Sequence, residues 1–597
     1  MEKDVKVLIQ TEHEGDAAQM DAIFNEYHRI LLEAPAGCGK TKTMVSKVAY
    51  ILSSDILPAN KKILALTFSV NAAYKMKKDI AEKLPHMGID SVTSPAMLNH
   101  KIFITNYHGF ARRVLKLYGY LLHSNISNIN LFVAYNEENL EGMQEVGITI
   151  TDEEERLLQS FSNSVKSCNS DKIEKLFKQY CELLIQKFIP KSCITYNGYL
   201  VLCIKLLEDK RELKDFYQLL YPYIMVDEFQ DTNYLSWKLL KLLIDKDTKL
   251  FLMGDSLQRI YGFIGAIPDL LEIAKKEFST KKIQLNRNYR FRNNPNMLLL
   301  DENIRRNAED YLHPVIGNNA KINLSLFNTQ EQEAENVAQL VKALIKSQDD
   351  RVAILIQQRN PNIEIIMKQF EKDSIDYFYG LFSDEDMEYI EYHQEALKTF
   401  FSILEISKTK RVNKTLLNKV CNRLCQHYKN SSSKVIQSLL ILTEAFFDKL
   451  LVEYAFLENE EKVAYINDTF ENRALKQSMD YVDSKVFVST VHGAKGLEWS
   501  YVILPDMEPY VFPNYASLCG NCNFKTGRIN AGDYCRMQVA NHTPKEILEE
   551  LSIFYVAVTR AQKEVFFSAS RKRYNANGEM KNAQICCLLT LPGIEIR

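Results

Sequence analysis

The chain has 597 residues, too many for a single hydrophobic core, so its length predicts several domains. Apolar residues make up 46% and charged residues 25%, which is typical of a globular protein and excludes the disordered and collagen-like classes. The 74 Lys and Arg residues nearly balance 76 Asp and Glu residues, giving a net charge of −2. Any nucleic-acid contact must therefore use local basic patches.

The N-terminal sequence, MEKDVKVLIQTEHEGD, lacks the apolar segment of a signal peptide. No run approaches the ~18 to 20 apolar residues of a membrane span. We therefore expect a cytoplasmic protein without membrane contact. The 12 cysteines are dispersed, and several lie inside apolar runs, as expected of reduced thiols in a core rather than of a disulfide framework.

Short runs rich in Leu, Ile and Val predict buried parallel strands in both halves of the chain. They cover residues 30–33, 62–67, 223–226, 250–253, 352–356, 486–489 and 501–504. Helical periodicity separates these runs, and it dominates from about 116 to 220 and from about 385 to 478. The pattern predicts the α/β class, with two sheet-based cores that each carry a mostly helical insertion.

A phosphate-binding pattern follows the first predicted strand. It comprises Ala34, Pro35, Ala36, Gly37, Cys38, Gly39, Lys40 and Thr41, with Ala34 in place of the usual first glycine. The backbone N–H groups can wrap phosphates, Lys40 can reach the β- and γ-phosphates, and the Thr41 hydroxyl can bind Mg²⁺. A tight strand-to-helix turn that binds nothing is the alternative, but the Lys-Thr pair directly after a strand favours a nucleotide site.

Two adjacent carboxylates follow the strand predicted at 223–226. Asp227 would hold Mg²⁺, and Glu228 would orient and deprotonate the attacking water. Two acids at this position would also suit the N-cap of a helix. The catalytic interpretation is favoured because the run continues as Phe-Gln-Asp-Thr-Asn through Asn233.

The run Asp227-Glu-Phe-Gln-Asp-Thr-Asn233 resembles a motif of the UvrD/Rep/PcrA-like superfamily 1 DNA helicases, and the resemblance extends over most of the chain. It implies two RecA-like P-loop NTPase cores with parallel sheets, and ATP and Mg²⁺ as cofactors. The implied domains are core 1A at 1–115 and 216–275, helical insertion 1B at 116–215, core 2A at 276–384 and 480–597, and a reduced helical insertion 2B at 385–479.

Further nucleotide contacts follow from this resemblance. Gln19 lies 21 residues before Lys40 and matches the glutamine that reads adenine, because an amide can pair with both N6 and N7. In the segment Leu285-Asn-Arg-Asn-Tyr289-Arg290, the family's tyrosine stacks on adenine and its arginine contacts the γ-phosphate.

Three more residues match family positions around the phosphates and the ribose. Gln258 corresponds to the γ-phosphate sensor, Glu498 to the acid that contacts the ribose, and Arg560 to an arginine finger, an effect of ~10³ to 10⁵ in rate in related hydrolases. An interdomain salt bridge is the alternative role for Arg560. The resemblance thus implies catalytic roles for Lys40, Asp227, Glu228, Gln258, Arg290 and Arg560.

Aromatic and polar residues from several motifs match the family's single-strand groove. Stacking, worth about 1 to 3 kcal/mol per base, and phosphate hydrogen bonds suit a motor that steps without reading sequence. The implied set is Thr67, Phe68, Asn106, Tyr107, His108, Tyr261, Phe263, Thr490 and His492. Core packing is the alternative for Phe68 and for the neighbouring motif residue Phe110.

Departures from the family pattern affect the expected DNA contacts. Asn71 and Ile264 stand where the family usually has Lys and Arg, which would weaken phosphate or interdomain contacts. The short 2B region predicts an efficient translocase whose unwinding is weak or depends on a partner.

A second metal site is considered in the polar segment after Pro513. Cys519, Cys522, Cys535 and His542 offer the four ligands of a structural Zn²⁺ site, although the spacer before His542 is irregular. The alternative is a loop with incidental thiols. The C-terminal region lacks the nuclease signature of helicase–nuclease fusions, so we expect no intrinsic nuclease.

The expected function is 3′→5′ movement on single-stranded DNA, coupled to strand separation at single-strand/duplex junctions, in repair, recombination or phage defence with a nuclease or repair protein as partner. One alternative is an ATP-gated DNA-binding or sensor subunit that controls a partner nuclease. A small-molecule P-loop kinase is disfavoured by the presence of Gln258, Arg290 and Arg560. An RNA helicase remains a third alternative.

Overall fold

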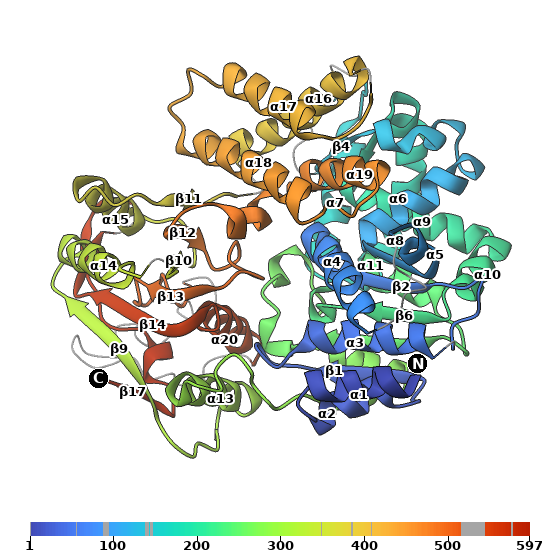
Figure 1. The fold of residues 1–597 in the computed structure, drawn as a ribbon. Coiled ribbons are helices and arrows are strands. Elements are labelled where there is room, and N and C mark those ends of the chain that lie inside the picture. Colours follow the sequence, from blue (N-terminus) through green and yellow to red (C-terminus); the bar gives the residue numbers. More distant parts are fainter. Residues whose placement is uncertain are drawn as a thin grey trace. The chain divides into compact units, whose positions relative to one another are not determined.

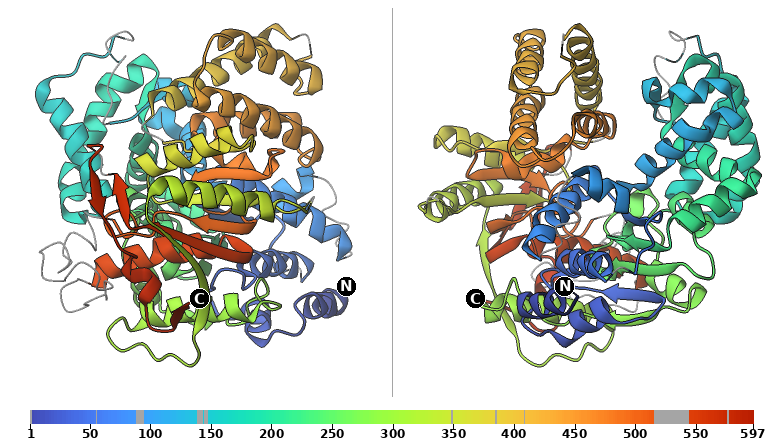
Figure 2. Two further views of the ribbon diagram at one scale, coloured as in Figure 1. Left: turned by 90° about the vertical axis from the view of Figure 1, so that its left-hand side faces the viewer. Right: turned by 45° about the vertical axis from the view of Figure 1, so that its right-hand side comes forward.

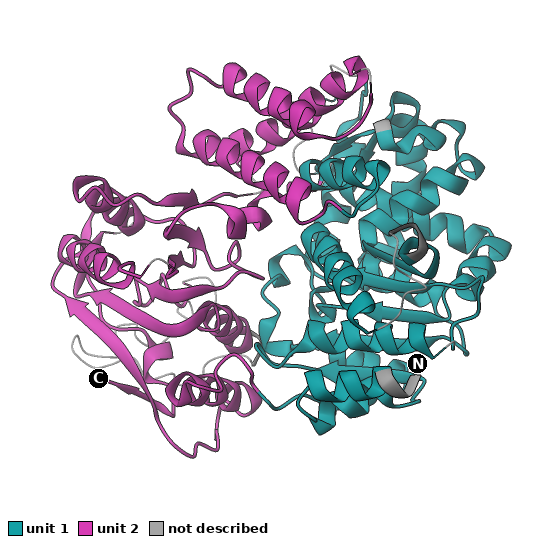
Figure 3. Cartoon of the chain, in the orientation of Figure 1, with its two compact units in different colours: residues 1–287, 456–471 teal, residues 288–455, 472–597 magenta. Residues whose placement is uncertain are grey.

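The chain forms two compact units (Figure 3). The structure is a computed structural model that describes residues 2–54, 56–87, 95–137, 143, 147–347, 349–383, 386–407, 409–514, 544–574 and 577–597. Unit 1 comprises Met1–Arg287 and Phe456–Glu471, and unit 2 comprises Asn288–Ala455 and Asn472–Arg597. Across the described ranges, no helix is long and apolar enough to cross a membrane.

A six-stranded sheet in the order β3-β2-β6-β7-β1-β8 forms the centre of unit 1 (Figure 1). Every pairing is parallel, so the carboxyl ends of all six strands lie at one edge of the sheet. The strands are β1 (Arg29–Glu33), β2 (Ile63–Thr67), β3 (Ile102–Asn106), β6 (Tyr223–Val226), β7 (Lys249–Gly254) and β8 (Lys281–Gln284).

Alternating side chains of this sheet enter two separate cores. Ile30 and Leu32 of β1 pack on one face, whereas Leu31 packs on the other, as the two-residue period of a strand requires. The first face is covered by α1 (Glu2–Glu12), α2 (Ala17–Phe24), α3 (Lys40–Ser53), α4 (Val70–His86) and α5 (Pro95–Lys101). Because strands buried on both faces need apolar residues at every position, their sequences read as continuous apolar runs.

The other face carries a larger set of helices, including the helical stretch predicted from about 116 to 220. These helices are α6 (Tyr107–Tyr118), α7 (Asp152–Lys166), α8 (Ser170–Leu183), α9 (Tyr196–Asp209), α10 (Arg211–Leu220), α11 (Tyr234–Leu243) and α12 (Leu270–Glu277). The inserted helices and the sheet share one continuous hydrophobic core. A short parallel pair, β4 (Val133–Tyr135) and β5 (Cys193–Thr195), lies within this region.

Unit 2 is built on a second parallel sheet, of seven strands in the order β11-β12-β10-β13-β14-β9-β17. The strands are β9 (Ala320–Phe327), β10 (Val352–Ile356), β11 (Phe378–Gly380), β12 (Val486–Thr490), β13 (Trp499–Leu504), β14 (Ala561–Ser570) and β17 (Ile594–Ile596). An antiparallel pair, β15 (Lys572–Tyr574) and β16 (Met580–Asn582), follows β14. The seven predicted strands and the α/β class are thereby confirmed.

Two groups of helices accompany the second sheet. The first comprises α13 (Pro295–Glu309), α14 (Gln330–Leu344), α15 (Pro361–Lys372) and α20 (Pro544–Val558). The second comprises α16 (Met387–Ile406), α17 (Lys414–His427) and α18 (Lys434–Val452), which pack on one another and stand together, yellow to orange, in Figure 2. The helical stretch predicted from about 385 is therefore present.

Helix α19 (Asn459–Glu471) packs within unit 1, although the sequence places it in the predicted 2B insertion. The Tyr465 ring stacks on Tyr74 of α4 with centroids 3.7 Å apart, and Arg112 of α6 forms an ion pair with Asp468 at 3.1 Å. The chain thus returns to unit 1 for one helix before it re-enters unit 2 at Asn472. The division into four domains stays a prediction.

Candidate active site

The predicted functional residues of unit 1 follow the carboxyl ends of its parallel strands. This edge is where α/β sheets bind ligands, because helix N-termini and irregular loops meet there. The phosphate loop follows β1, Thr67 ends β2 and Phe68 follows it, Asn106 ends β3, Asp227 follows β6 and Asp255 follows β7.

The phosphate loop has the backbone conformation that its glycines permit. Gly37 and Gly39 have φ angles of 77° and 78°, in the left-handed region where a side chain would be strained. The Ala34 N–H donates to the Gly254 carbonyl at 3.0 Å, which anchors the start of the loop to β7. Lys40 begins α3, so the loop leads directly into a helix N-terminus, where anions are favoured.

Lys40 is held between the two predicted catalytic carboxylates. Its Nζ donates to Glu228 Oε1 at 2.6 Å and lies 4.0 Å from Asp227 Oδ1. Burial alone would lower the pKa of Lys40, but the charges of Glu228 and Asp227 outweigh it and raise the pKa above its ordinary value. The structure thus brings the loop lysine, the metal-binding acid and the proposed base together.

The donor set at this place fits Mg²⁺. Thr41, in the first turn of α3, offers a hydroxyl, and Asp227 offers a carboxylate beside the Lys40 ammonium. Hard oxygen atoms of this kind, with phosphate oxygens and water, are the ligands that Mg²⁺ prefers.

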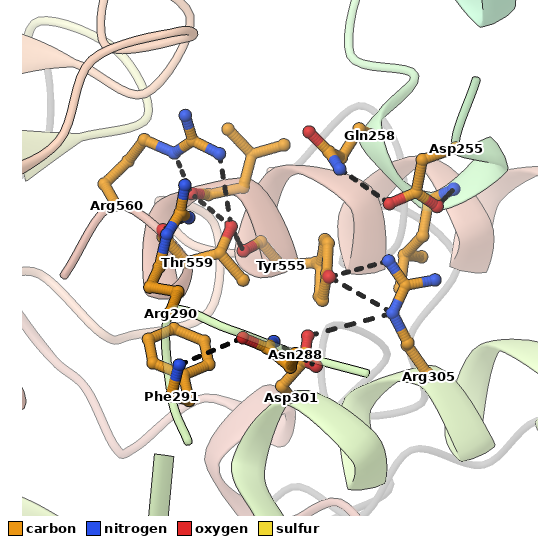
Figure 4. Close-up of polar contacts among 12 residues, drawn as sticks. Asp255, Gln258, Asn288, Arg290, Phe291, Asp301, Arg305, Tyr555, Thr559 and Arg560 are labelled. Atoms are coloured by element: carbon orange, nitrogen blue, oxygen red, sulfur yellow. Dashed lines mark hydrogen bonds and ion pairs between the residues drawn. The ribbon is translucent and has the colours of Figure 1, made fainter. Parts of the chain in front are cut away.

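A chain of hydrogen bonds extends from Glu228 to Gln258. Gln230 Nε2 donates to Glu228 Oε2, and Gln230 Oε1 accepts from the Asp255 backbone N–H at 3.1 Å. Gln258 Nε2 in turn donates to Asp255 Oδ2 at 2.7 Å (Figure 4). The sequence analysis assigned no role to Gln230, which lies in the Asp227–Asn233 motif, or to Asp255, three residues before Gln258. Their contacts are those of residues that position Glu228 and Gln258.

Gln19, on α2, also contacts the phosphate loop. Its Nε2 donates to the Cys38 carbonyl at 2.9 Å, and its Oε1 accepts from His13 Nδ1. Burial lowers the pKa of His13, which keeps the ring neutral, and His13 Nε2 lies 2.7 Å from Ser46 Oγ. Reading an adenine would require the Gln19 amide to exchange one of these contacts. His13 is a further residue that the sequence did not single out.

Arg290 lies near the start of unit 2, and its guanidinium is held by two contacts. It forms an ion pair with Glu498. Its Nη1 donates to the Thr559 carbonyl at 2.6 Å (Figure 4). Gln562 Nε2 also donates to Glu498, at 3.3 Å. The predicted γ-phosphate and ribose residues thus contact each other, and the partly exposed Tyr289 precedes them.

A second network supports the segment that carries Tyr289 and Arg290. Asn288 donates from Nδ2 to Asp301 Oδ2 at 3.2 Å and accepts at Oδ1 from the Phe291 backbone N–H at 3.0 Å. Arg305 donates from Nη2 to the Tyr555 hydroxyl at 2.6 Å and lies 3.7 Å from Asp301 (Figure 4). Asn288 therefore fixes the backbone on both sides of the predicted adenine and phosphate contacts.

Arg560 is buried within unit 2, with 4% of its surface exposed. Its Nε donates to the Val556 carbonyl at 3.0 Å and its Nη1 to the Leu497 carbonyl at 3.2 Å. An arginine finger has to present its guanidinium outside its own domain. In the conformation described, Arg560 instead joins α20 to the segment before β13, and the predicted finger would require a different rotamer.

Aromatic residues of the predicted groove adjoin one another in unit 1. The Phe68 and Tyr261 rings stack at a centroid distance of 4.8 Å, and Phe263 lies 6.2 Å from Tyr261. Phe263 is 61% exposed, far more than packing would leave a core phenylalanine. These three side chains, from the ends of two parallel strands, form an aromatic platform that we call the Phe68–Phe263 platform.

The predicted groove residues at the start of α6 also have local structural roles. Asn106 caps the helix by accepting from the Gly109 backbone N–H at 2.6 Å. Tyr107 is 6% exposed and Phe110 is 1% exposed, both within the hydrophobic core, so the alternative of core packing holds for Phe110. Burial lowers the pKa of His108 to about 4, which keeps this side chain neutral near pH 7.

Thr490 and His492 of the predicted groove, and the two positions that depart from the family pattern, lie in the following surroundings. Thr490 ends β12, and its Oγ1 accepts from the Gly493 backbone N–H at 3.1 Å, while His492 lies in the turn between them. Asn71, where the family usually has Lys, accepts from the Tyr465 hydroxyl at 3.2 Å. Ile264 is 38% exposed beside Phe263.

The predicted zinc ligands Cys519, Cys522, Cys535 and His542 lie outside the described residues. Other cysteines expected in the core, at 193, 203, 586 and 587, are buried.

These features define the class of protein. Two parallel α/β sheets, a glycine-containing phosphate loop with its lysine, and an acid pair after a neighbouring strand are the elements of a P-loop nucleotide hydrolase with two RecA-like cores.

Comparison with known proteins identifies the family. The profile of the UvrD/REP helicase N-terminal domain matches residues 16–279, and that of the UvrD-like helicase C-terminal domain matches residues 383–572. The chain therefore belongs to the UvrD/Rep family of helicases.

Named relatives align over nearly the whole chain. A probable DNA helicase II homolog of Mycoplasma capricolum is 23% identical over 93% of this chain and 84% of its own length. The ATP-dependent DNA helicase PcrA of Staphylococcus aureus is 23% identical over 93% and 83%, and the ATP-dependent DNA helicase Rep of Buchnera aphidicola from Schizaphis graminum is 22% identical over 94% of both chains. Family membership makes the chain an ATP-hydrolysing DNA helicase by class.

Proposed function

We propose that this chain moves 3′→5′ along single-stranded DNA by hydrolysing ATP, and that it separates strands at single-strand/duplex junctions. The observation that carries the proposal is the continuous contact path from Lys40 through Glu228, Gln230 and Asp255 to Gln258. Such a path links the phosphate loop to the strand end from which the platform residue Tyr261 follows, so that nucleotide and DNA contacts share one sheet edge.

Each residue of the path has a chemical role in the proposed reaction. Lys40 exchanges its contact with Glu228 for the β- and γ-phosphates, which frees the Glu228 carboxylate to accept a proton from the attacking water. Asp227 and Thr41 would hold Mg²⁺, which would supply positive charge beside the phosphates. Gln258 would sense the γ-phosphate while it contacts Asp255, and Arg290 would supply positive charge. Arg560 would do so only after its guanidinium leaves the Val556 and Leu497 carbonyls.

The Phe68–Phe263 platform supplies the proposed DNA contact. Aromatic rings can stack on any base, which suits movement without sequence preference, and Phe263 is the most exposed of the three. The hydrogen bond from Tyr465 to Asn71 shows that the family's basic position is used here for a contact inside unit 1. We therefore propose that phosphate contacts are fewer than in the basic members of the family, and that the affinity for DNA depends more on stacking.

The same observation favours a second candidate function. A chain with fewer phosphate contacts and a short 2B region could act as an ATP-gated DNA-binding subunit that controls a partner nuclease, in repair or in phage defence. Both functions use the same ATP site, so they differ only in whether hydrolysis produces movement along DNA.

The test measures the ATPase rate of the full chain with and without single-stranded DNA, for wild type and for Glu228→Gln. Release of a fluorescent strand from a duplex with a 3′ tail is followed in the same reactions. Glu212→Gln, an exposed acid on α10, is the matched control.

We expect DNA to stimulate the wild type and the control, with strand release, and we expect Glu228→Gln to lose both through a rate loss of roughly 10² to 10⁴. Stimulation without strand release would favour the gated subunit. An ATPase that is indifferent to DNA would contradict both functions.

A further inference from the structure

Unit 2 contains three buried carboxylates whose oxygen atoms converge. One oxygen from each of Glu333, Asp506 and Glu508 lies within 4.8 Å of the other two. All three residues have at most 1% of their surface exposed. Glu333 lies in the first turn of α14, and Asp506 and Glu508 follow β13. None of them has been given a role in ATP or DNA binding.

Glu333 is surrounded by hydrogen-bond donors. Ser568 and Ser570 of β14 donate from Oγ at 2.6 and 2.7 Å, Asn362 donates from Nδ2 at 3.1 Å, and the Asp506 backbone N–H donates at 3.3 Å. A protonated carboxyl would waste one of these four donors, because it carries its own hydrogen. The surroundings of Glu333 are therefore built for an ionised carboxylate.

The other two acids are less well satisfied. Asp506 accepts from Asn360 Nδ2 at 2.8 Å and from Asn362 Nδ2 at 2.7 Å. Glu508 Oε1 accepts from the Ser570 backbone N–H, but Glu508 Oε2 is buried without a hydrogen-bond partner. Asn362 is completely buried, its amide reaches both Glu333 and Asp506, and its Oδ1 also has no partner.

Glu508 Oε2 and Asn362 Oδ1 are both hydrogen-bond acceptors. The cluster therefore has more acceptor oxygen atoms than donors or positive charges to pair with them. Leaving one buried acceptor unpaired costs ~1 to 3 kcal/mol, and more if it is charged. Arg573 is the cation whose charge acts on Asp506 and Glu508, and the N-termini of α14 and α15 add roughly half a positive charge each. The negative charge of three ionised carboxylates is larger than the positive charge that Arg573 and the two helix N-termini supply.

The electrostatics agree with this deficit. Burial, followed by the neighbouring Asp506, raises the pKa of Glu333 to about 7. Burial, with the charges of Glu333 and Asp506, also raises the pKa of Glu508 well above its usual range. A cation among these oxygen atoms would offset the charge that burial and the neighbouring carboxylates make costly.

We propose that Glu333, Asp506 and Glu508, joined by Asn362 Oδ1 after a half-turn of its amide, bind one divalent cation of the size of calcium. Carboxylate and amide oxygens are ligands for hard cations. The three oxygen atoms lie no farther apart than two ligands on opposite sides of one Ca²⁺, which are about 5 Å apart. Mg²⁺ retains several waters, which suits an open site better than this buried one.

The bound cation would join three elements of the second core. Glu333 belongs to α14, Asn362 to the first turn of α15, and Asp506 and Glu508 to the segment after β13. A single ion would thereby fix two helix N-termini to the end of a central strand. The expected role is structural, separate from the Mg²⁺ that accompanies ATP.

The test titrates the full chain with CaCl₂ by calorimetry, after dialysis against EDTA and then metal-free buffer. We expect one Ca²⁺ per chain, a higher Tm in Ca²⁺, and release of protons at pH 6.5, because the ligands must ionise. Binding should persist when the chain is loaded with Mg·ADP, which separates this site from the nucleotide site.

Two variants test the assignment of the ligands. Glu508→Gln keeps the shape of the side chain but removes one charge, and it should weaken Ca²⁺ binding roughly tenfold or more. Glu331→Gln, an exposed acid on the same turn of α14, should bind like the wild type.

Each of the following outcomes would overturn the proposal. Absence of stoichiometric Ca²⁺ binding by the wild type, which does not depend on how any variant folds, would do so directly. Equal Ca²⁺ affinity of Glu508→Gln and wild type would exclude this cluster as the site. Selective binding of Mg²⁺ would refute the assigned ion size, whereas a wild type that ignores both ions, with Glu508→Gln more stable, would show that the cluster holds protons instead.

Discussion

At the scale of single residues, Tyr261 offers a direct probe of the proposed DNA contact. Its ring stacks on Phe68 and precedes the exposed Phe263. Tyr261→Ala should raise the concentration of oligothymidine that half-activates the ATPase, by roughly 5- to 150-fold, because a lost base stack costs about 1 to 3 kcal/mol. Tyr120→Ala, which removes a 55% exposed tyrosine elsewhere in unit 1, should leave that concentration unchanged. Equal effects of the two variants would contradict the platform.

His108 makes a separate prediction about pH. Its pKa is lowered to about 4 by burial, with a contribution from Arg112, so between pH 4 and 6.5 the unfolded chain binds a proton that the folded chain does not. This contribution to the free energy of unfolding is present above pH 6.5 and is lost as the pH falls towards 4. His108→Gln should therefore lose less stability than the wild type between pH 7 and pH 4.5.

The measurement is urea unfolding at the two pH values, with His86→Gln as control. His86 is exposed at the end of α4, so its removal should leave the loss of stability close to that of the wild type. If His108→Gln lost as much stability as the wild type between pH 7 and pH 4.5, the His108 imidazole would not be the cause of the pH dependence.

Some residue roles could be predicted from the sequence motifs, and others could not. The contact of Lys40 with Asp227 and Glu228 follows from the fold, since residues after parallel strands meet at one sheet edge. Gln230, Asn288 and His13 were not assigned roles, because their function is to hydrogen-bond other site residues, and a partner distant in sequence leaves no local pattern.

At the scale of elements, buried strands were predictable where both faces are apolar, as in β6 (Tyr223–Val226) and β10 (Val352–Ile356). The strand β9 was missed because its exposure varies along its length, which removes the continuous apolar signal. The strand β14 was also missed. It begins at Ala561, only three residues after α20 ends at Val558, so no turn residues separate the two elements. This junction was identified in the sequence only by the motif that contains Arg560. The packing of α19 in unit 1 could not be predicted, since long-range partners decide it.

The docking of α19 makes an element-scale prediction. Arg112 is 12% exposed in its side chain and pairs with Asp468 and Glu471, so Arg112→Met leaves two acids without their partner. Breaking such a buried pair costs about 3 to 5 kcal/mol. In Arg112→Met, the backbone hydrogen exchange of residues 459–471 should become faster by a large factor. In the control Arg113→Met, which changes the exposed neighbouring arginine, the exchange rate should stay unchanged. Unaltered protection in Arg112→Met would mean that the stacked rings of Tyr74 and Tyr465 suffice.

At the scale of the whole molecule, the family and the site together define a motor, but a direction of movement is not contained in any one contact. It depends on how two cores alternate their grip on a strand during each ATP cycle. We expect the grip of unit 1 to rest on the Phe68–Phe263 platform and that of unit 2 on residues near Thr490, each after the carboxyl end of strands in its own parallel sheet.

The proposed 3′→5′ direction predicts an asymmetric displacement of streptavidin from biotinylated oligothymidine. A motor with this polarity pushes towards the 5′ end, so ATP should speed the release of streptavidin from a 5′ biotin and leave release from a 3′ biotin at its spontaneous rate. Lys40→Ala, which removes the phosphate-binding ammonium, should abolish the difference. Faster release from the 3′ end would reverse the assigned polarity. Equal, spontaneous release from both ends, with DNA-stimulated ATPase intact, would instead favour the gated subunit, because ATP would then be hydrolysed without movement.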